Sequence, residues 1–226
     1  MQRNHGLRLS IQQRLQDTPV QSVASTNLRR AAVALVLVDA GFGAELPGFA
    51  QHSKWSDEAA FLLTRRATTL TSHAGQWALP GGRIDAGETA AAAALRELHE
   101  ELGLQLPPAS VLGRLDDYTT RSGYVITPFV VWADFGTESG PEPALRPDPA
   151  EVASAHRIPL SELLRADAPL IDPPHEGHSQ PVLRMPLGDH WVAAPTAAVL
   201  HQFCEWCLHG RSTRVAHFDQ PRFTWR

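Results

Sequence analysis

The sequence predicts an α/β protein in which a mixed β-sheet lies between helices, as an α/β/α sandwich. Three observations lead to this prediction. A valine-rich apolar run, Arg30–Ala40, is typical of a buried strand. Further strand-like segments stand on both sides of an alanine-rich helix that starts near Ala90. A second amphipathic helix, Pro195–Leu208, comes near the end of the chain.

Length and composition favour one elaborated domain. The chain has 226 residues, of which 43% are hydrophobic and 19% charged. We expect an N-terminal helical extension at 1–29, a catalytic domain at 30–210 and a tail at 211–226. The net charge of −4 gives no basic footprint for nucleic acid. The absence of a secretory signal in the first twenty residues and of a long apolar run predicts a cytoplasmic protein with no membrane partner.

Before the central helix, apolar runs predict strands and polar or glycine-rich stretches predict loops. A short helix, Gly6–Gln16, opens the extension, and it could pack on the domain or support a dimer. The elements expected next are a strand at Arg30–Ala40, a loop at Gly41–Asp57, a strand at Ala59–Arg66, and a loop with a short strand at Ala67–Gly82.

After the central helix, the same criteria predict four more strands and a second helix. The expected strands are Val111–Tyr118, Tyr124–Asp134, Ala155–Pro159 and a final one at Val182–Leu187, with a loop at Gly136–Pro149 near the cleft mouth and a turn at His175–Gln180. Ser161 is expected to cap a short helix. Cys204 and Cys207 form a C-x-x-C pair that we interpret as ordinary thiols, in preference to a redox or zinc motif.

Three carboxylates gather on one side of the central helix. At about 100° per residue, Glu97, Glu100 and Glu101 fall within an arc of roughly 100°. Like charges at these offsets destabilise a helix, and a bound cation reverses the sign. Oxygen ligands without His or Cys favour Mg²⁺, with Mn²⁺ as the alternative. Arg96 could pair with Glu88 or Glu97 and hold a carboxylate in place. The competing interpretation is a solvated acidic face.

The complete pattern decides between these interpretations. The stretch Gly82–Leu104, GRIDAGETAAAAALRELHEELGL, places Gly82, Glu88, Arg96-Glu97, Glu100-Glu101 and Gly103 at the spacing of the Nudix box. The chain therefore resembles the Nudix hydrolases. The resemblance implies a Nudix-type fold, a divalent metal held by Glu97, Glu100 and Glu101, and the Gly81 carbonyl as a further ligand. It also implies catalytic roles for Arg96 and Glu88, and hydrolysis of a nucleoside diphosphate linked to another moiety.

The residues before the box suggest a substrate. Leu62–Gly82, LLTRRATTLTSHAGQWALPGG, resembles the coenzyme A pyrophosphatases, in which Leu-Leu-Thr-x-Arg, His-x-Gly and Phe-Pro-Gly-Gly elements recur. Leu79 departs from this pattern, because it stands where Phe is usual. The resemblance implies cleavage of coenzyme A or its derivatives to 3′,5′-ADP and (acyl-)4′-phosphopantetheine. ADP-ribose, NADH and other nucleotides remain alternatives, as does a non-catalytic Nudix-fold nucleotide sensor, against which the intact glutamates argue.

Several residues outside the box are further candidates. Arg65 and Arg66 could bind phosphates as planar donors, although arginines at strand ends are often surface charges. Glu151 is the candidate for a remote general base, with a box glutamate as the alternative and a solvent-facing acid as the ordinary interpretation. His73 is expected to make a structural hydrogen bond. The partner is a small nucleotide, and a homodimer is an alternative to a monomer by analogy with relatives.

Overall fold

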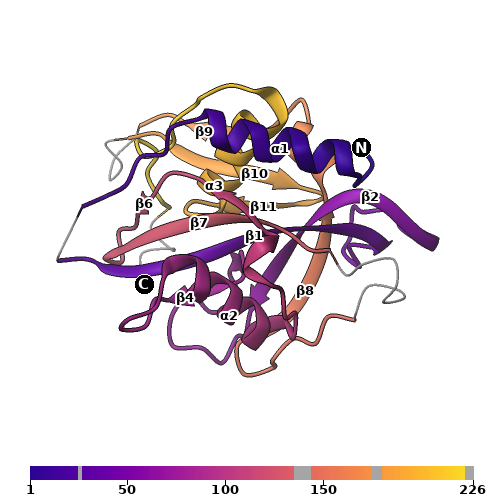
Figure 1. The fold of residues 1–226 in the computed structure, drawn as a ribbon, viewed down its shortest axis with the longest axis horizontal. Coiled ribbons are helices and arrows are strands. Elements are labelled where there is room, and N and C mark those ends of the chain that lie inside the picture. Colours follow the sequence, from indigo (N-terminus) through magenta and orange to yellow (C-terminus); the bar gives the residue numbers. More distant parts are fainter. Residues whose placement is uncertain (25–26, 135–143, 175–179, 222–226) are drawn as a thin grey trace.

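The computed structural model describes residues 1–24, 27–134, 144–174 and 180–221. Its centre is an eight-stranded mixed sheet whose main path runs β3-β2-β1-β7-β5 (Figure 1). Three more strands join this path, since β4 pairs with β1, β6 with β7 and β8 with β2. The strands are Arg29–Gly43 (β1), Gln51–Arg66 (β2), Trp77–Ala78 (β3), Gly81–Arg83 (β4), Val111–Arg114 (β5), Tyr118–Thr119 (β6), Tyr124–Trp132 (β7) and Val152–Pro159 (β8).

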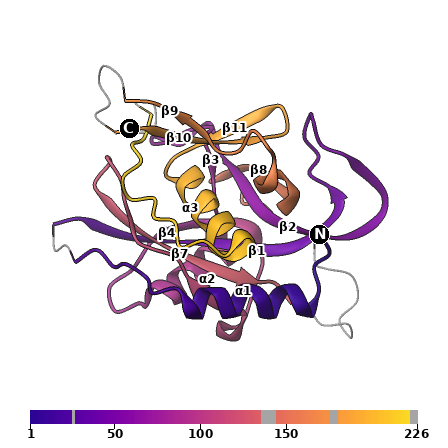
Figure 2. The same ribbon diagram turned by 90° about the horizontal axis from the view of Figure 1, so that it is seen from above.

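Helices cover both faces of this sheet. The remaining elements are α1 (His5–Asp17), α2 (Ala90–Leu102), α3 (Thr196–Phe203), the short helices Pro108–Ser110, Leu160–Leu164 and Cys204–His209, and a small sheet of Leu170–Asp172 (β9), Val182–Leu187 (β10) and His190–Ala193 (β11). Figures 1 and 2 show α2 on one side of the sheet, with α1, α3 and the small sheet on the other. The predicted α/β/α arrangement is confirmed.

Strand β1 divides the hydrophobic core into two layers. Its side chains alternate, so Ala34 and Val36 pack with Leu98 of α2, whereas Leu35 and Leu37 join a second cluster that includes α1 and α3. The strand runs parallel to β7 and antiparallel to β2 and β4. Burial on both faces explains why its sequence is almost continuously apolar.

The predicted loop at Gly41–Asp57 is wrong over most of its length. Strand β1 continues to Gly43 and β2 begins at Gln51, so only residues 44–50 connect them. Gly41 and Gly43 adopt positive φ angles of 61° and 109°, and the β1–β2 register shifts at both. The glycines are therefore irregular positions within a continuing ladder and not the end of the strand.

Three other element predictions also need correction. The segment predicted as one strand at Val111–Tyr118 is divided between β5 and β6. Val182–Leu187 is a strand but not the final one, because β11 follows it. Ser161 does not cap a helix: it lies inside the 3₁₀ segment Leu160–Leu164, and its hydroxyl donates to Glu58 at 3.1 Å. Cys204 and Cys207 are buried and form no disulfide with each other.

Two adjacent buried carboxylates fasten the flanking segments to the sheet. Asp116 accepts hydrogen bonds from Arg214 at 2.8 Å and from the backbone of Gln21 at 2.6 Å. Asp117 accepts from the backbone of Val23 at 2.9 Å. Residues before β1 and after α3 are thus attached at one point of the domain, while the proposed boundaries at 29/30 and 210/211 remain predictions.

Some predictions lie on residues that are not described. These are most of the loop Gly136–Pro149, most of the turn His175–Gln180, and the last five residues. No helix in the described part of the chain is long and apolar enough to cross a membrane.

Candidate active site

Helix α2 begins at Ala90, as predicted, and both of its ends are capped. The Thr89 hydroxyl accepts a hydrogen bond from the backbone of Ala92 at 3.2 Å, which satisfies one free donor of the first turn. Gly103 ends the helix in the left-handed conformation with φ of 71°. The alanines of the first turns pack closely on the sheet, and the last two turns carry the acidic residues toward β4 and the loop before β8.

Three carboxylates meet beside α2. One oxygen each from Glu97, Glu101 and Glu151 lies within 4.8 Å of the others. Glu151 reaches this point because the loop before β8 is hydrogen bonded to the end of α2: the backbone of Asp148 donates to the Glu101 carbonyl at 2.9 Å, and that of Arg146 donates to the Leu102 carbonyl at 2.9 Å. The structure therefore brings the predicted remote base next to two predicted metal ligands.

Glu100 lies outside this cluster. Its side chain is 55% exposed and accepts a hydrogen bond from Arg96 at 2.8 Å. On the helix it is turned away from Glu101 by about 100°. The structure thus brings together two of the three box glutamates, and the third faces the solvent side of the same helix.

Arg96 connects the loop before α2 to the acidic helix face. Its guanidinium donates to both oxygens of Glu88 at 3.1 Å, to Glu97 at 2.9 Å, to Glu100 and to the Arg83 carbonyl at 3.0 Å. The expected pairing with Glu88 and Glu97 is present. These bonds raise the pKa of Arg96 and lower that of Glu88. Arg96 therefore fixes the direction of Glu97, which faces the cluster.

Glu101 is buried without a counter-charge in hydrogen-bond contact. It is 3% exposed, and its Oε2 atom has no hydrogen-bond partner among the described residues. Burial raises its pKa to about 8, against the lowering effects of the Arg66 charge and of a backbone hydrogen bond with Gly81. Burial also raises the pKa of Glu97. An unpaired buried carboxylate is costly, so this oxygen fits a bound cation.

The two glycines of β4 give this cluster its space. Gly81 adopts φ of 153° opposite Val33, and a Cβ atom there would collide with the backbone of Ala32 and Val33. A Cβ atom on Gly82 would collide with the Glu97 carboxylate. Only glycine lets β4 lie this close to both β1 and α2. Gly81, predicted as a ligand through its carbonyl, lies beside Glu101, with which its backbone makes a hydrogen bond.

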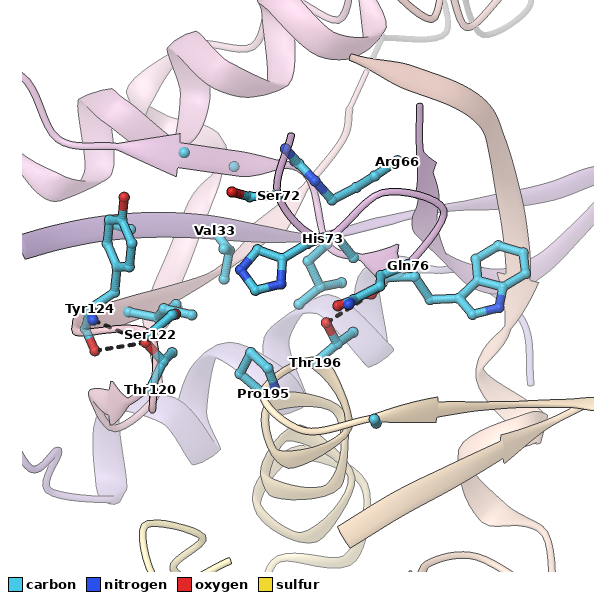
Figure 3. Close-up of a pocket in the computed structure, with 18 of the residues that line it drawn as sticks. Val33, Arg66, Ser72, His73, Gln76, Thr120, Ser122, Tyr124, Pro195 and Thr196 are labelled. Carbon is cyan, nitrogen blue, oxygen red and sulfur yellow. Dashed lines mark hydrogen bonds between the residues drawn. The ribbon is translucent and has the colours of Figure 1, made fainter. Parts of the chain in front are cut away.

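A cleft of about 910 Å³ opens next to β4. Its walls come from the first half of β1, from β4, from the start of β7, from the loop 70–79 and from residues 191–199. Figure 3 shows Thr120, Ser122 and Tyr124 at one end, Arg66 toward the other, and Val33 between them. Three arginines and one histidine line the cleft, and none of the described lining residues is acidic.

The neighbouring arginines at the end of β2 point to different places. Arg66 lines the cleft, its charge acts on Glu101, and its buried Nε atom has no hydrogen-bond partner among the described residues. Arg65 is exposed, donates to the Gly75 carbonyl at 3.2 Å and lies 5.7 Å from the ring of Trp77. The structure places only Arg66 in the cleft.

Residues 54–176, more than half of the chain, match the sequence model of the NUDIX domain. The chain belongs to the Nudix family. It is 33% identical over 193 residues to "Uncharacterized Nudix hydrolase NudL" of Photorhabdus laumondii, and the aligned part covers 84% of this chain and 91% of that protein. A protein of the same name from Enterobacter sp. is 32% identical over 189 residues, covering 81% and 85%.

Among solved structures, the chain is similar to a MutT/nudix family protein from Enterococcus faecalis. The two share 16% identity with a TM-score of 0.45, and the match covers 75% of this chain and 52% of that one.

Sequence reasoning missed part of the cleft lining. Arg29, Arg83 and Tyr124 line the cleft and were not candidates. Arg83 follows Gly82 directly in the box, a signal that was available. Arg29 meets Tyr124 only through the parallel register of β1 and β7, which spacing alone does not reveal. His73 also lines the cleft; its ring bonds to Gln76, and burial lowers its pKa.

Proposed function

We propose that this Nudix hydrolase is a Mg²⁺-dependent pyrophosphohydrolase that cleaves coenzyme A or its derivatives to 3′,5′-ADP and (acyl-)4′-phosphopantetheine. The observation that carries the proposal is the position of the acidic cluster of Glu97, Glu101 and Glu151 beside a large cleft whose described lining contains no acidic residue. Such a pairing suits an anionic substrate whose phosphates meet a cation. The choice of coenzyme A is supported by the stretch Leu62–Gly82, which forms much of the cleft wall.

The residues that would hold the metal are Glu97 and Glu101, with the Gly81 backbone and the Glu151 carboxylate next to them. Carboxylate and carbonyl oxygens favour Mg²⁺ or Mn²⁺ over zinc. When bound, such a cation neutralises phosphate charge and activates water as a Lewis acid. Glu100 would join these ligands only after leaving its hydrogen bond to Arg96.

The other residues bind, orient and accept protons. Arg66 offers a planar donor pair to a phosphate at the junction of cleft and cluster. Arg96 holds Glu97 in place from outside the cleft. Water adds to one phosphorus, the bridging P–O bond breaks, and the second phosphate leaves with the bridging oxygen. Glu151, exposed at the edge of the cluster, is proposed to take the proton of the attacking water.

A substrate panel tests this function. Coenzyme A, acetyl-coenzyme A, ADP-ribose, NADH and nucleoside triphosphates are incubated with the full chain and Mg²⁺ or Mn²⁺, and the products are identified by mass spectrometry. We expect the highest kcat/KM with a coenzyme A compound. A preference for ADP-ribose or NADH would contradict the choice of substrate but not the class of reaction.

The alternative of a nucleotide sensor makes the opposite prediction for the same panel. A sensor would bind one nucleotide and turn over none. Binding measured by calorimetry together with no product at any metal concentration would support the sensor and overturn the proposed hydrolase.

A further inference from the structure

One end of the cleft carries two arginines around a tyrosine; we name Arg29, Arg83 and Tyr124 the Tyr124 end. The guanidinium carbon of Arg29 lies 4.0 Å from the centre of the Tyr124 ring. The Nε atom of Arg83 donates to the Tyr124 hydroxyl at 3.0 Å. All three residues line the cleft, so the two guanidinium groups and the tyrosine border the space in which a substrate would lie.

These two arginines have no carboxylate partner among the described residues. Arg29 donates to the Ser122 carbonyl at 2.8 Å, and Arg83 has the Tyr124 hydroxyl. By contrast, Arg96, Arg121 and Arg214 each pair with an acid. Two such cations at the end of a cleft with no acid among its described lining residues favour an anion there, although the whole chain carries a net charge of −4.

The donors at this end suit a phosphate monoester. The Tyr124 hydroxyl accepts from Arg83, and its own hydrogen has no acceptor in the described part of the chain. Two planar guanidinium groups and this hydroxyl can together meet the three terminal oxygens of a phosphate. A single carboxylate would leave several of these donors unused.

Arg29 and Tyr124 lie apart from the point at which a pyrophosphate would meet the acidic cluster. Arg29 and Val33 both line the cleft. Val33 lies opposite Gly81, and the Gly81 backbone is hydrogen bonded to Glu101. Four residues of β1 separate these points by about 13 Å. That distance spans a ribose together with part of its pyrophosphate, so the Tyr124 end meets a different group of the same substrate.

The opposite flank of the cleft differs in character. Trp77 belongs to β3, two strands from β1 on the side away from β7. With Leu79 and Trp191 it forms a largely apolar wall, which suits the moiety that is not a nucleotide. The nucleoside half of the substrate would then lie at the Tyr124 end.

We infer that the Tyr124 end binds a second phosphate, a monoester carried on the nucleoside half of the substrate and remote from the scissile pyrophosphate. The inference rests on the proposed function for the identity of the pyrophosphate substrate. It deepens that function by assigning the residues that select for the additional phosphate.

Two paired measurements test it. Calorimetry compares binding of adenosine 3′,5′-bisphosphate and 5′-AMP, which differ only in the second phosphate. Kinetics with Mg²⁺ compares coenzyme A with 3′-dephospho-coenzyme A. Both are applied to the wild type, Arg29→Gln, Arg83→Gln and the control Arg211→Gln, which removes the same charge from a side chain that is 68% exposed and outside the cleft lining.

We expect the wild type to favour the bisphosphate and coenzyme A by about tenfold or more, a difference of one charge-assisted contact. Arg29→Gln and Arg83→Gln should reduce both preferences. The affinity for 5′-AMP and the kcat/KM for 3′-dephospho-coenzyme A should change little in these variants, and Arg211→Gln should retain both preferences. Thermal unfolding of each variant checks that it is folded. Unchanged preferences in both folded cleft variants, or no preference in the wild type, would overturn the inference.

The two arms separate this inference from the proposed function. If coenzyme A is not hydrolysed, the proposed substrate is wrong, but a bisphosphate preference that depends on Arg29 and Arg83 still establishes the second phosphate site. If coenzyme A is hydrolysed without regard to the 3′-phosphate, the function holds and the inference is wrong.

Discussion

The acidic cluster and the Tyr124 end are two parts of one site that are built in opposite ways. The cluster is acidic and partly buried, and it comes from one helix and a loop hydrogen bonded to that helix. The Tyr124 end is cationic and more exposed, and it comes from the starts of β1 and β7 and from the end of β4, three strands that the sheet brings together. Under the proposed function, the reaction depends on a compact local unit, whereas substrate selection depends on the tertiary fold.

The largest effect is expected at the buried carboxylate of the cluster. Glu101→Gln should lower kcat by about 10³-fold, because it removes a charged oxygen from the proposed metal site. Glu100→Gln should cost about tenfold or less, since Glu100 contacts Arg96 and lies outside the cluster. Steady-state kinetics with Mg²⁺ and circular dichroism measure both. Equal losses in the two variants would show that the helix presents its glutamates differently during turnover.

A smaller effect is expected at the junction between the two parts. Arg66→Gln should lower kcat/KM by about 10- to 100-fold, the value of a charge-assisted hydrogen bond to phosphate. Arg65→Gln, which changes the neighbouring residue of the same type, should cost less than about threefold, because Arg65 lies against Trp77 outside the cleft lining. The reverse order would place the phosphate path on the other side of β2.

The pH dependence of stability tests the burial of the cluster without any substrate. The pKa of Glu101 is about 8 in the folded protein against 4.5 for the free group. Between these values the folded state holds a proton that the unfolded state releases, so stability present at low pH is lost as the pH rises toward 8. In chelator, Tm should fall by several degrees between pH 5 and 9, at about 2–4 °C per kcal/mol.

The variant Glu101→Gln isolates this contribution, because its Tm should fall less over the same range. Histidines with lowered pKa values, such as His156, act at lower pH and are common to both proteins. Mg²⁺ should raise the wild-type Tm more at pH 8.5 than at pH 6, since metal binding needs the ionised carboxylate. Parallel pH curves for the two proteins would contradict the raised pKa.

The smallest effect is expected at the hydroxyl of the Tyr124 end. Tyr124→Phe keeps the ring that Arg29 covers and removes the oxygen that orients Arg83. We expect the bisphosphate preference to fall by about threefold, less than for loss of either arginine. A loss as large as that of Arg83→Gln would show that the hydroxyl itself is the main phosphate contact.

The acidic helix could be predicted because its determinants are close in sequence. Helical spacing relates Glu97 to Glu101, and Gly103 has the conformation expected of a helix end. Spacing could not separate Glu100 from its neighbours, because their difference depends on Arg96, which binds four oxygen-bearing groups at once. Glu151 was a candidate by analogy alone, and only the hydrogen bonds of its loop explain its position.

The fold class could be predicted for the same reason, and the errors came from glycine and from long-range pairing. The glycines Gly41 and Gly43 led to the prediction of a loop, yet the β1–β2 ladder continues past them with altered register. In the small sheet β10 was predicted, but its neighbours β9 and β11 were missed because they have only three and four residues.

The attachment of the Glu151 loop to the last turn of α2 has a consequence for how such proteins can change. Two backbone hydrogen bonds hold the loop against the end of the helix. Substitutions in the walls of the cleft, around Tyr124 or Trp191, can then accumulate without moving the proposed proton acceptor relative to the proposed metal ligands. Residues in those walls could be replaced to accept other nucleotides while the helix and its loop stay unchanged. This chain is therefore a suitable scaffold for changing substrate preference.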